Sequence, residues 1–315
     1  MSAESKIAHL KDRALFLQKA RSFFFEKGFL EVDTPILSKT APIDEHIDIM
    51  TVSLGEGKLG YLHSSPEYAM KRLLCMGSGD IFQISHVFRQ GEVGSLHNPE
   101  FTMAEWYRMH TSFTAFIEET VSFIQLFLGP ISCVKISYKE AFRLFANIDS
   151  SKASAQELLN CAKIHGIDLA TKTELDKDTL LHLLMGFVIE PHLGQNVITV
   201  LTDYPASQAA LAETEEKEGE LIAKRFEIYY QGIELANGYL ELTDARKQKL
   251  RLLESNEKRV QGGKLPLPID NNFLNALEKG LPPCCGVAVG FDRLLLLKNK
   301  VSSLNDILPF GWSEV

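Results

Sequence analysis

The sequence predicts an α+β fold in which antiparallel strands are joined by hairpins and helices occur in separate blocks. Two β-rich runs, 81–89 and 100–108, flank a polar loop, which is typical of a long-looped antiparallel hairpin. Apolar residues three and four apart predict a helix over 10–27 that ends at Gly28. Strands joined by hairpins, with helices grouped elsewhere, favour α+β over alternating β-α-β units.

The rest of the chain completes this prediction. Further helices are expected at 113–128, 243–261 and 291–299, and further strands at 29–33, 197–203, 225–230, 233–235 and 286–289. The segment 149–191 is rich in helix formers and poor in motifs, which predicts a helical insertion. Because no internal repeat or low-complexity linker interrupts the sequence, a single domain over 1–315 is expected.

Charge and composition exclude several classes of protein. The 315 residues include 33 Lys and Arg against 41 Asp and Glu, a net charge of −8, whereas nucleic-acid binders usually carry a basic surface. Hydrophobic residues at 45% and charged residues at 23% are typical of globular chains, so disordered and fibrous classes are excluded. No apolar stretch could span a bilayer and no signal-peptide pattern occurs, so a cytoplasmic protein is expected.

The five cysteines lack the spacing of a zinc site or a disulfide framework. The adjacent Cys284 and Cys285 are expected to be small, buried apolar residues. The common nucleotide-binding motifs, such as the P-loop and the dinucleotide fingerprint, are also absent from the sequence. Any nucleotide site must therefore be built in another way.

One predicted strand carries polar groups on an apolar face. Phe101, Met103, Glu105 and Tyr107 are spaced by two residues, so they share one side of the strand 100–108. A carboxylate and a phenol thus project together from an apolar surface. The alternative, a half-buried strand whose Glu meets a surface Lys, stays open at this point.

Two arginines are candidates for binding phosphate. Arg89 ends the first strand of the hairpin, and Arg293 opens the last helix after Gly290. A guanidinium matches phosphate oxygens, and the start of a helix adds backbone donors and partial positive charge. Together they could clamp a triphosphate without a P-loop, although either could instead form a surface ion pair.

Glu227 and Glu234 are candidates for holding Mg²⁺. Their spacing of seven would put them on opposite faces of one straight strand, but a turn at Gln231-Gly232 would bring them together. Paired carboxylates beside phosphate-binding arginines are what a nucleotide-bound Mg²⁺ requires. The next residues are also unusually polar for a core strand, although Asn237-Gly238 could be a simple turn.

Three segments resemble the motifs of class II aminoacyl-tRNA synthetases, in the family's order. Motif 1, which builds the family's dimer interface, is similar to FFFEKGFLEVDTPIL (23–37). Motif 2 is similar to IFQISHVFRQGEVGSLHNPEFTMAEWYR (81–108), and motif 3 to GVAVGFDRLLLL (286–297). The resemblance runs from about residue 10 to the end. It implies an antiparallel sheet flanked by helices.

Two further segments resemble lysyl-tRNA synthetases: YLHSSPEYAMKRLL (61–74) and FEIYYQGIELANGYLELTDAR (226–246). Motif 1 begins within the first thirty residues, so no anticodon-binding domain is expected before it. The sequence is therefore most similar to the stand-alone paralogues of these synthetases, the elongation factor P β-lysine ligases. Ser65 stands where the synthetases tend to have Ala, and Ala288 where they have Gly. The extra methyl of Ala288 would crowd an α-amino group and favour a β-amine.

The resemblance implies ATP-dependent formation of a β-lysyl-adenylate and transfer of β-lysine to a lysine side chain of elongation factor P. It implies Arg89 and Arg293 as catalytic residues and Glu227 and Glu234 as ligands of Mg²⁺. The implied amino-acid pocket contains Ser65, Pro66, Glu67, Glu105, Tyr107, Asn237, Tyr239, Glu241 and Ala288. The implied ATP site contains Arg89, Gln90, Gly91, Glu92, His97, Asn98, Phe101, Glu227, Ile228, Glu234, Gly290 and Arg293. A homodimer without tRNA as a partner is expected.

Motif 2 departs from the family at two places. Gly91 stands where the family has a Glu that contacts adenine, and Glu92 follows one position later, where a strand would point it to the other face. Ser95-Leu96 replaces a frequent Arg in the loop. Two alternatives therefore stay open: an α-lysine ligase with another acceptor, and a non-catalytic paralogue that binds lysine or ATP.

Overall fold

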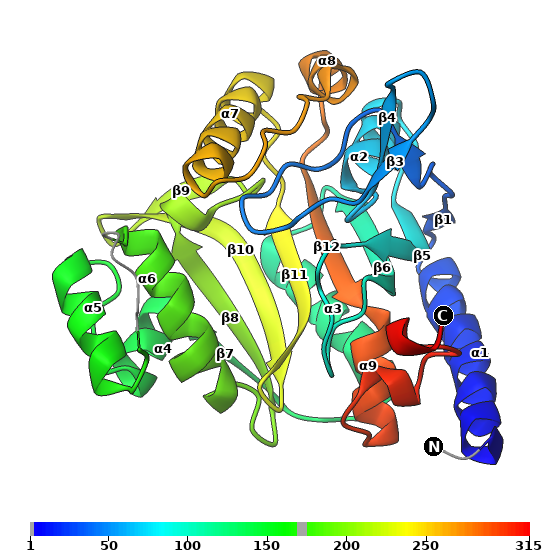
Figure 1. Cartoon of the computed structure of the whole chain (residues 1–315), viewed down its shortest axis with the longest axis horizontal. Coiled ribbons are helices and arrows are strands. Elements are labelled where there is room, and N and C mark those ends of the chain that lie inside the picture. Colours follow the sequence, from blue (N-terminus) through cyan, green and yellow to red (C-terminus); the bar gives the residue numbers. More distant parts are fainter. Residues whose placement is uncertain (1–2, 169–174) are drawn as a thin grey trace. The chain divides into compact units, whose positions relative to one another are not determined.

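The computed structural model describes residues 3–168 and 175–315. The chain, which is coloured along the sequence in Figure 1, divides into two compact units. Unit 1 comprises Met1–Gly129 and Glu241–Val315, and unit 2 comprises Pro130–Leu240. Each is described by itself, and the expectation of a single domain stays a prediction.

The main sheet of unit 1 carries the predicted hairpin. Its strands, in spatial order, are β1 (Leu30–Glu31), β5 (Ile81–Phe88), β6 (Glu100–Met109) and β12 (Cys284–Gly290). β5 and β6 are antiparallel, from Ile81 opposite Tyr107 to Phe88 opposite Glu100, which confirms the predicted pairing. β12 is antiparallel to β6, and the short β1 is parallel to β5.

Helices surround this sheet. They are α1 (Ala3–Glu26), α2 (Glu67–Cys75), α3 (Phe113–Leu128), α7 (Ala245–Gln261), α8 (Asn271–Lys279) and α9 (Phe291–Asn299). α3 and α9 have the predicted bounds, and α1 begins earlier than predicted but ends just before Gly28, whose φ is +80°. Gly adopts this left-handed conformation without the steric cost that a Cβ would add, so it can end the helix.

Aromatic side chains join α1 and α3 to the sheet. The ring of Phe24 stacks on Phe82 with centroids 4.3 Å apart, and it also contacts Trp106 at 5.1 Å and Phe123 at 5.2 Å. All four side chains are buried. Because aromatic rings bury large areas, this cluster contributes strongly to the stability of unit 1.

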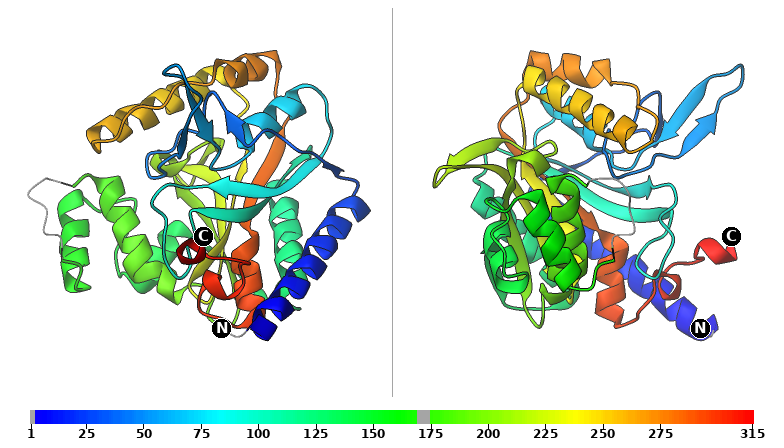
Figure 2. Two further views of the ribbon diagram at one scale, coloured as in Figure 1. Left: turned by 45° about the vertical axis from the view of Figure 1, so that its right-hand side comes forward. Right: turned by 60° about the vertical axis from the view of Figure 1, so that its left-hand side comes forward.

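A second, small sheet lies beside α2, and the sequence patterns did not predict it. Its strands, in spatial order, are β2 (Leu37–Ser38), β4 (Leu59–Leu62) and β3 (Thr51–Ser53). Tyr68 of α2 stacks on Phe273 of α8 with centroids 4.3 Å apart. In Figure 2, α7 and α8 lie at the end of unit 1 that carries this sheet, and α1 and α9 lie at the opposite end.

The sheet of unit 2 contains the predicted hairpin of β10 and β11. Its strands, in spatial order, are β7 (Cys133–Ser137), β8 (Ile198–Pro205), β10 (Glu220–Tyr230) and β11 (Ile233–Leu240), with β9 (Thr214–Lys217) also on β10. β7 is parallel to β8, and the other pairs are antiparallel. The turn occurs at Gln231 and Gly232, both with positive φ, as predicted. Asn237-Gly238 lies inside β11, so its interpretation as a turn is wrong.

Three helices among the described residues cover the core of unit 2, and the last two of them lie within the predicted insertion. They are α4 (Tyr138–Phe145), α5 (Ala155–Ile164) and α6 (Lys177–Leu184), followed by a π-helical turn at Met185–Ile189. α5 and α6 confirm helix within 149–191, of which residues 169–174 lie outside the described residues. α5 begins with a capping box between Ser154 and Glu157, which satisfies backbone donors at its start.

Two expectations from composition have structural outcomes. Among the residues that the structure describes, no helix is both long enough and apolar enough to span a bilayer. Cys284 and Cys285 are buried in β12, as predicted, and burial raises the pKa of the Cys284 thiol. A protonated thiol in this setting packs as a small apolar group.

Candidate active site

Glu105 is the centre of a buried polar cluster in unit 1. It projects from β6 together with Tyr107, and both side chains are only 2% exposed. The hydroxyl of Tyr107 donates to one carboxylate oxygen at 2.7 Å, and the hydroxyl of Ser65 donates to the other at 2.7 Å. Glu105 therefore does not meet a surface Lys, and the alternative of an ordinary half-buried strand is wrong.

Ser65, Pro66 and Glu67 bring the start of α2 to this cluster. Pro66 is the N-cap residue, and the backbone N–H of Glu67 donates to the Ser65 hydroxyl at 3.0 Å. Glu67 points toward Lys71 in the next helical turn, where its carboxylate accepts from the Lys71 ammonium at 2.6 Å. Residues four apart face the same side of a helix, which explains this contact.

Glu241 joins the cluster from the chain that follows β11. Its backbone N–H donates to the carbonyl of Cys284 at 3.0 Å, which anchors it beside β12. Its carboxylate lies 2.5 Å from the ammonium of Lys71. The predicted residues Ser65, Glu67, Glu105, Tyr107 and Glu241 thus lie together within unit 1, and the structure adds Lys71.

Gly286 is a second residue that the sequence patterns missed. It lies opposite Tyr107 in the β6–β12 pair, and a Cβ at this position would come within 2.3 Å of both Glu241 Oε1 and the Tyr107 ring. Only Gly therefore fits here. Ala288, two residues later on the same face, lies opposite Glu105. The alternating small residues at 286, 288 and 290 were a signal for this close approach.

The cluster carries more negative than positive charge. Burial, reinforced by the nearby charge of Glu67, raises the pKa of Glu105 to about 7 despite its two hydrogen bonds. Burial also raises the pKa of Glu241 to about 8, although Lys71 opposes this shift. Three carboxylates face one ammonium, which leaves a formal charge of −2 when all are ionised. A ligand with two positive charges would neutralise it.

A second group of polar residues in unit 1 lies between the end of β5 and the start of α9. Arg293, in the first turn of α9, lies with Nη2 2.9 Å from Nε2 of His97. Burial, then the charges of Arg293 and Arg89, lower the pKa of His97, so its imidazole is neutral at pH 7. Because the charges of both arginines lower the pKa of His97, both lie close to it, as expected for residues of one site.

Arg89 keeps an unused buried donor. Its guanidinium lies over the ring of Phe101 at 5.2 Å, and its nearest carboxylate, that of Glu92, is 3.7 Å away. Its Nε is buried without a hydrogen-bond partner among the described residues. An unsatisfied buried donor is costly, and an anion such as a phosphate would satisfy it.

The residues after Arg89 correct one step of the sequence argument. Gln90 and Gly91 lie beyond β5 in a turn, where Gly91 has a φ of +79° and the Gln90 N–H donates to Asp48. The alternation of strand faces therefore does not apply to Glu92. Asn98 is 8% exposed, and its amide donates to the carbonyl of Glu100 and accepts from the N–H of Trp312. It supports the loop that carries His97.

Unit 2 surrounds Glu227 with hydrogen-bond donors. Arg225 donates to one carboxylate oxygen at 2.5 Å, and the hydroxyls of Tyr204, at 2.5 Å, and Tyr229 donate to the other. Arg225 also lies over the Tyr204 ring at 4.5 Å. Glu227 is only 7% exposed. Because a buried charge must be paired, the ion pair with Arg225 explains how the protein tolerates this carboxylate.

The strand register decides which residues lie beside Glu227. Asn237 lies directly opposite it, whereas Glu234 lies opposite Tyr229. A shift of register between Ile228 and Tyr229 gives β11 one extra residue, which turns Glu234 to the face of Tyr229 and Glu227. Ile228 itself is fully buried on the other face, and Tyr239 lies opposite Arg225.

This group fits a hard divalent cation. Asn237 Oδ1 is buried without a hydrogen-bond partner among the described residues, and it belongs to the residue opposite Glu227. Carboxylate and amide oxygens are the ligands that Mg²⁺ prefers, and Mg²⁺ usually takes only one or two carboxylates from the protein. Glu227 and Glu234 would supply these carboxylates.

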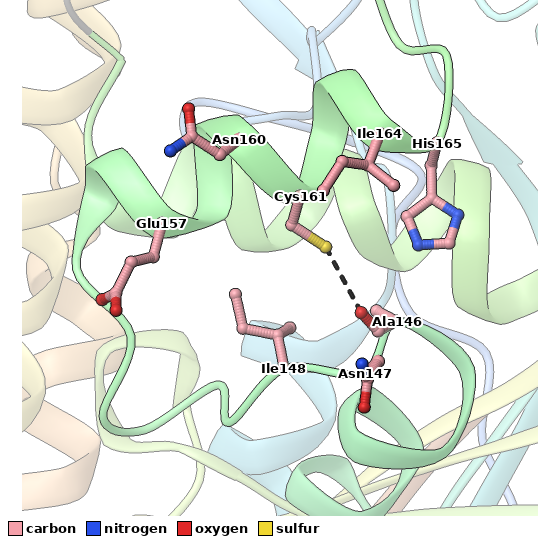
Figure 3. A pocket seen from close by; sticks show the side chains of 8 residues that line it. All are labelled: Ala146, Asn147, Ile148, Glu157, Asn160, Cys161, Ile164 and His165. Carbon is pink, nitrogen blue, oxygen red and sulfur yellow. Dashed lines mark hydrogen bonds between the residues drawn. The ribbon is translucent and has the colours of Figure 1, made fainter.

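A separate pocket of about 290 Å³ lies in unit 2 between α5 and the residues after α4 (Figure 3). Ile148, Cys161 and Ile164 line it with apolar surface, and the Cys161 thiol donates to the carbonyl of Ala146 at 3.4 Å. None of the residues predicted for the site lines this pocket. It therefore has no part in the arrangement described above.

Comparisons with known proteins agree with the motifs. The family model for class II tRNA synthetases (D, K and N) matches residues 1–314. The elongation factor P–(R)-β-lysine ligase of Sodalis glossinidius (strain morsitans) is 43% identical over 310 residues, which cover 97% of this chain and 95% of the relative. The ligases of the same name from Salmonella paratyphi B and Salmonella dublin are 42% identical over 311 residues, with the same coverage. The resemblance predicted from the sequence is confirmed, and the chain belongs to the class II tRNA synthetase family.

Proposed function

We propose that this chain is an ATP-dependent ligase that activates (R)-β-lysine as an adenylate and transfers it to a lysine side chain of elongation factor P. The observation that carries the proposal is the buried cluster of Glu67, Glu105 and Glu241, whose charge exceeds that of Lys71 by two when all three carboxylates are ionised. β-Lysine carries two ammonium groups, so it matches this surplus. The relatives at 42–43% identity, which bear the name of this activity, support the same substrate and acceptor.

The chemistry consists of two displacements. The carboxylate of β-lysine attacks the α-phosphorus of ATP, and pyrophosphate leaves. The amine of the acceptor lysine then attacks the carbonyl of the adenylate, loses a proton and forms an amide, and AMP leaves. Such reactions need positioning and charge neutralisation more than side-chain acid or base.

The two arginines bind different phosphates of ATP. Arg89, with its free Nε, binds the α-phosphate and the substrate carboxylate, and Arg293 binds the γ-phosphate at the start of α9. Glu227 and Glu234 would hold Mg²⁺, which would neutralise phosphate charge. His97 orients Arg293 through its neutral imidazole.

The choice between β-lysine and α-lysine rests on β12. Gly286 admits Tyr107 and Glu241 into the pocket, and the methyl of Ala288 lies on the face of Glu105. This methyl removes space beside the carbon that bears an α-amine. The pocket therefore favours an amine on the β-carbon.

The remaining partners follow from the family motifs. The chain acts in the cytoplasm as a homodimer, without tRNA as a substrate. Apolar side chains around motif 1 support a dimer interface: Phe25 and Leu30 are each 54% exposed. Light scattering of the purified chain tests the dimer, and Leu30→Asp is expected to yield monomers.

Pyrophosphate exchange with (R)-β-lysine and with α-lysine in parallel tests the activity, followed by intact-mass analysis of elongation factor P. The expected result is faster exchange with (R)-β-lysine and the mass of one β-lysyl group on the acceptor. Exchange that favours α-lysine would replace the proposed substrate. No exchange with either amino acid would refute a catalytic function.

A further inference from the structure

Lys71 is a buried ammonium inside the amino-acid cluster. Its side chain is 1% exposed, and its Nζ lies 2.6 Å from Glu67 and 2.5 Å from Glu241. Burial opposes the charged form, but Glu241 and Glu67 outweigh it and raise the pKa of Lys71 above its usual range. The ammonium therefore stays protonated at all physiological pH values.

The three carboxylates of the cluster have different partners. Lys71 bridges Glu67, which lies one helical turn away in α2, and Glu241, which is anchored at β12. Glu105 accepts its hydrogen bonds from two neutral hydroxyls, those of Ser65 and Tyr107. The internal ammonium is thus bonded to two carboxylates and leaves the third to neutral donors.

We infer that Lys71 is a positioning residue that sets the charge of the amino-acid pocket to match a dication and leaves Glu105 as the principal anchor for a substrate ammonium. The inference rests on the proposed function of this cluster and adds a residue to it. Without Lys71 the pocket would carry three carboxylates for two substrate ammonium groups. The surplus carboxylate would take up a proton, or repel its neighbours and move.

A purely structural role would require only that α2 be tied to the segment that carries Glu241. Two features go beyond this role. Lys71 lies 6.0 Å from the centre of the Tyr107 ring, so it contacts the residue that donates to Glu105. Both of its partners are also carboxylates proposed to contact substrate. The titratable groups around it are Glu67, Tyr68 and Cys75 of α2, Glu105 and Tyr107 of β6, Glu241, and Cys284 of β12.

The test compares Lys71→Met with the wild type in pyrophosphate exchange. The KM for (R)-β-lysine is expected to rise about 10- to 100-fold, as for loss of a hydrogen bond to a charged group, while the KM for ATP stays within about twofold. The rise of kcat/KM with pH is expected to move to higher pH by about 1 unit or more, because Glu241 loses its counterion. Lys298→Met, which removes an ammonium 2.5 Å from Asp12 outside the cluster, is the matched control and is expected to leave both KM values unchanged.

The double variant Lys71→Met/Glu241→Gln removes one charge of each sign and so avoids an uncompensated buried carboxylate. The pH profile of kcat/KM for the double variant is expected to return to that of the wild type. This measurement can be made even if Lys71→Met alone does not fold. A profile that stays displaced, or equal changes in the KM for ATP and for β-lysine, would overturn the inference. Absence of exchange by the wild-type protein would instead refute the proposed function.

Discussion

Nη2 of Arg293 lies 2.9 Å from Nε2 of His97, in the loop between the two strands of motif 2. The neutral imidazole accepts a hydrogen bond from the guanidinium, which holds Arg293 toward the end of β5. The geometry links the first turn of α9 to the loop after Arg89. Residues of motifs 2 and 3 thereby form one group, which is the proposed binding site for the phosphates of ATP.

Removal of the Arg293 guanidinium is expected to abolish adenylate formation. Arg293→Ala should lower the rate of pyrophosphate exchange by about 100-fold or more, since a charged donor to a phosphate is lost. Arg21→Ala is the control, because Arg21 forms a partly exposed ion pair with Glu31. A retained exchange rate in Arg293→Ala would mean that the phosphate clamp lies elsewhere.

Gly286→Ala is expected to close the amino-acid pocket. Its Cβ would lie 2.3 Å from Glu241 Oε1 and from the Tyr107 ring, so one of the two must move. The KM for the amino acid should rise at least about tenfold with little change in the KM for ATP. Gly186→Ala is a matched control, because a Cβ there meets nothing within 4 Å. An unchanged KM for the amino acid would contradict the proposed position of the pocket.

Glu105 is expected to make the stability of the unliganded protein depend on pH. Its pKa in the folded state is raised to about 7, above the ordinary value of 4.5, so folding is disfavoured as pH rises between these values. The loss is on the order of 3 kcal/mol at pH 7 and above. Glu105→Gln should therefore lose less stability than the wild type between pH 5 and pH 8 in urea unfolding. Parallel pH profiles for the two proteins would refute the shift.

The same carboxylate is expected to control substrate binding. Below about pH 7 it is protonated and loses its attraction for an ammonium, so the KM for the amino acid should rise as pH falls. Glu105→Gln should raise this KM at pH 8 and flatten its pH dependence, as measured by pyrophosphate exchange. A variant that keeps the wild-type profile would show that another group titrates.

Arg225 is expected to stabilise unit 2 through Glu227. Arg225→Met leaves the Glu227 carboxylate buried with only two tyrosine donors, which should lower the free energy of unfolding by about 3–5 kcal/mol. Addition of Glu227→Gln to this variant should recover part of the loss, because the uncompensated charge is removed. Urea unfolding of the two single variants and the double variant measures this coupling. Additive losses would contradict a direct pair.

Local patterns were sufficient for several parts of the site. The spacing of two residues along β6 predicted that Glu105 and Tyr107 share a face, and the structure confirms it with a direct hydrogen bond. The turn at Gln231-Gly232 predicted the hairpin of β10 and β11. These features depend on residues close in sequence, whose geometry follows from backbone periodicity.

Other parts depended on register and on packing between distant segments. The sequence spacing brought Glu227 and Glu234 together through a turn. In the structure Asn237 lies opposite Glu227, and an extra residue in β11 places Glu234 on the face of Glu227. No local pattern predicts where a strand gains one residue. The assumption of alternating faces after Arg89 was also wrong, because β5 ends at Phe88 and the chain then turns.

The sequence by itself determined the family, the motif residues and the alternation that directs Glu105 and Tyr107 to one face, because these depend on residue identity and local backbone geometry. The tertiary structure alone decided that Lys71 joins Glu67 to Glu241, that Gly286 must lack a side chain, and that Arg225 neutralises Glu227. Glu241 and Gly286 reach the cluster from segments far from α2 and β6 in sequence. Whether such groups meet depends on strand register and on close packing, which fix distances to within a fraction of an ångström.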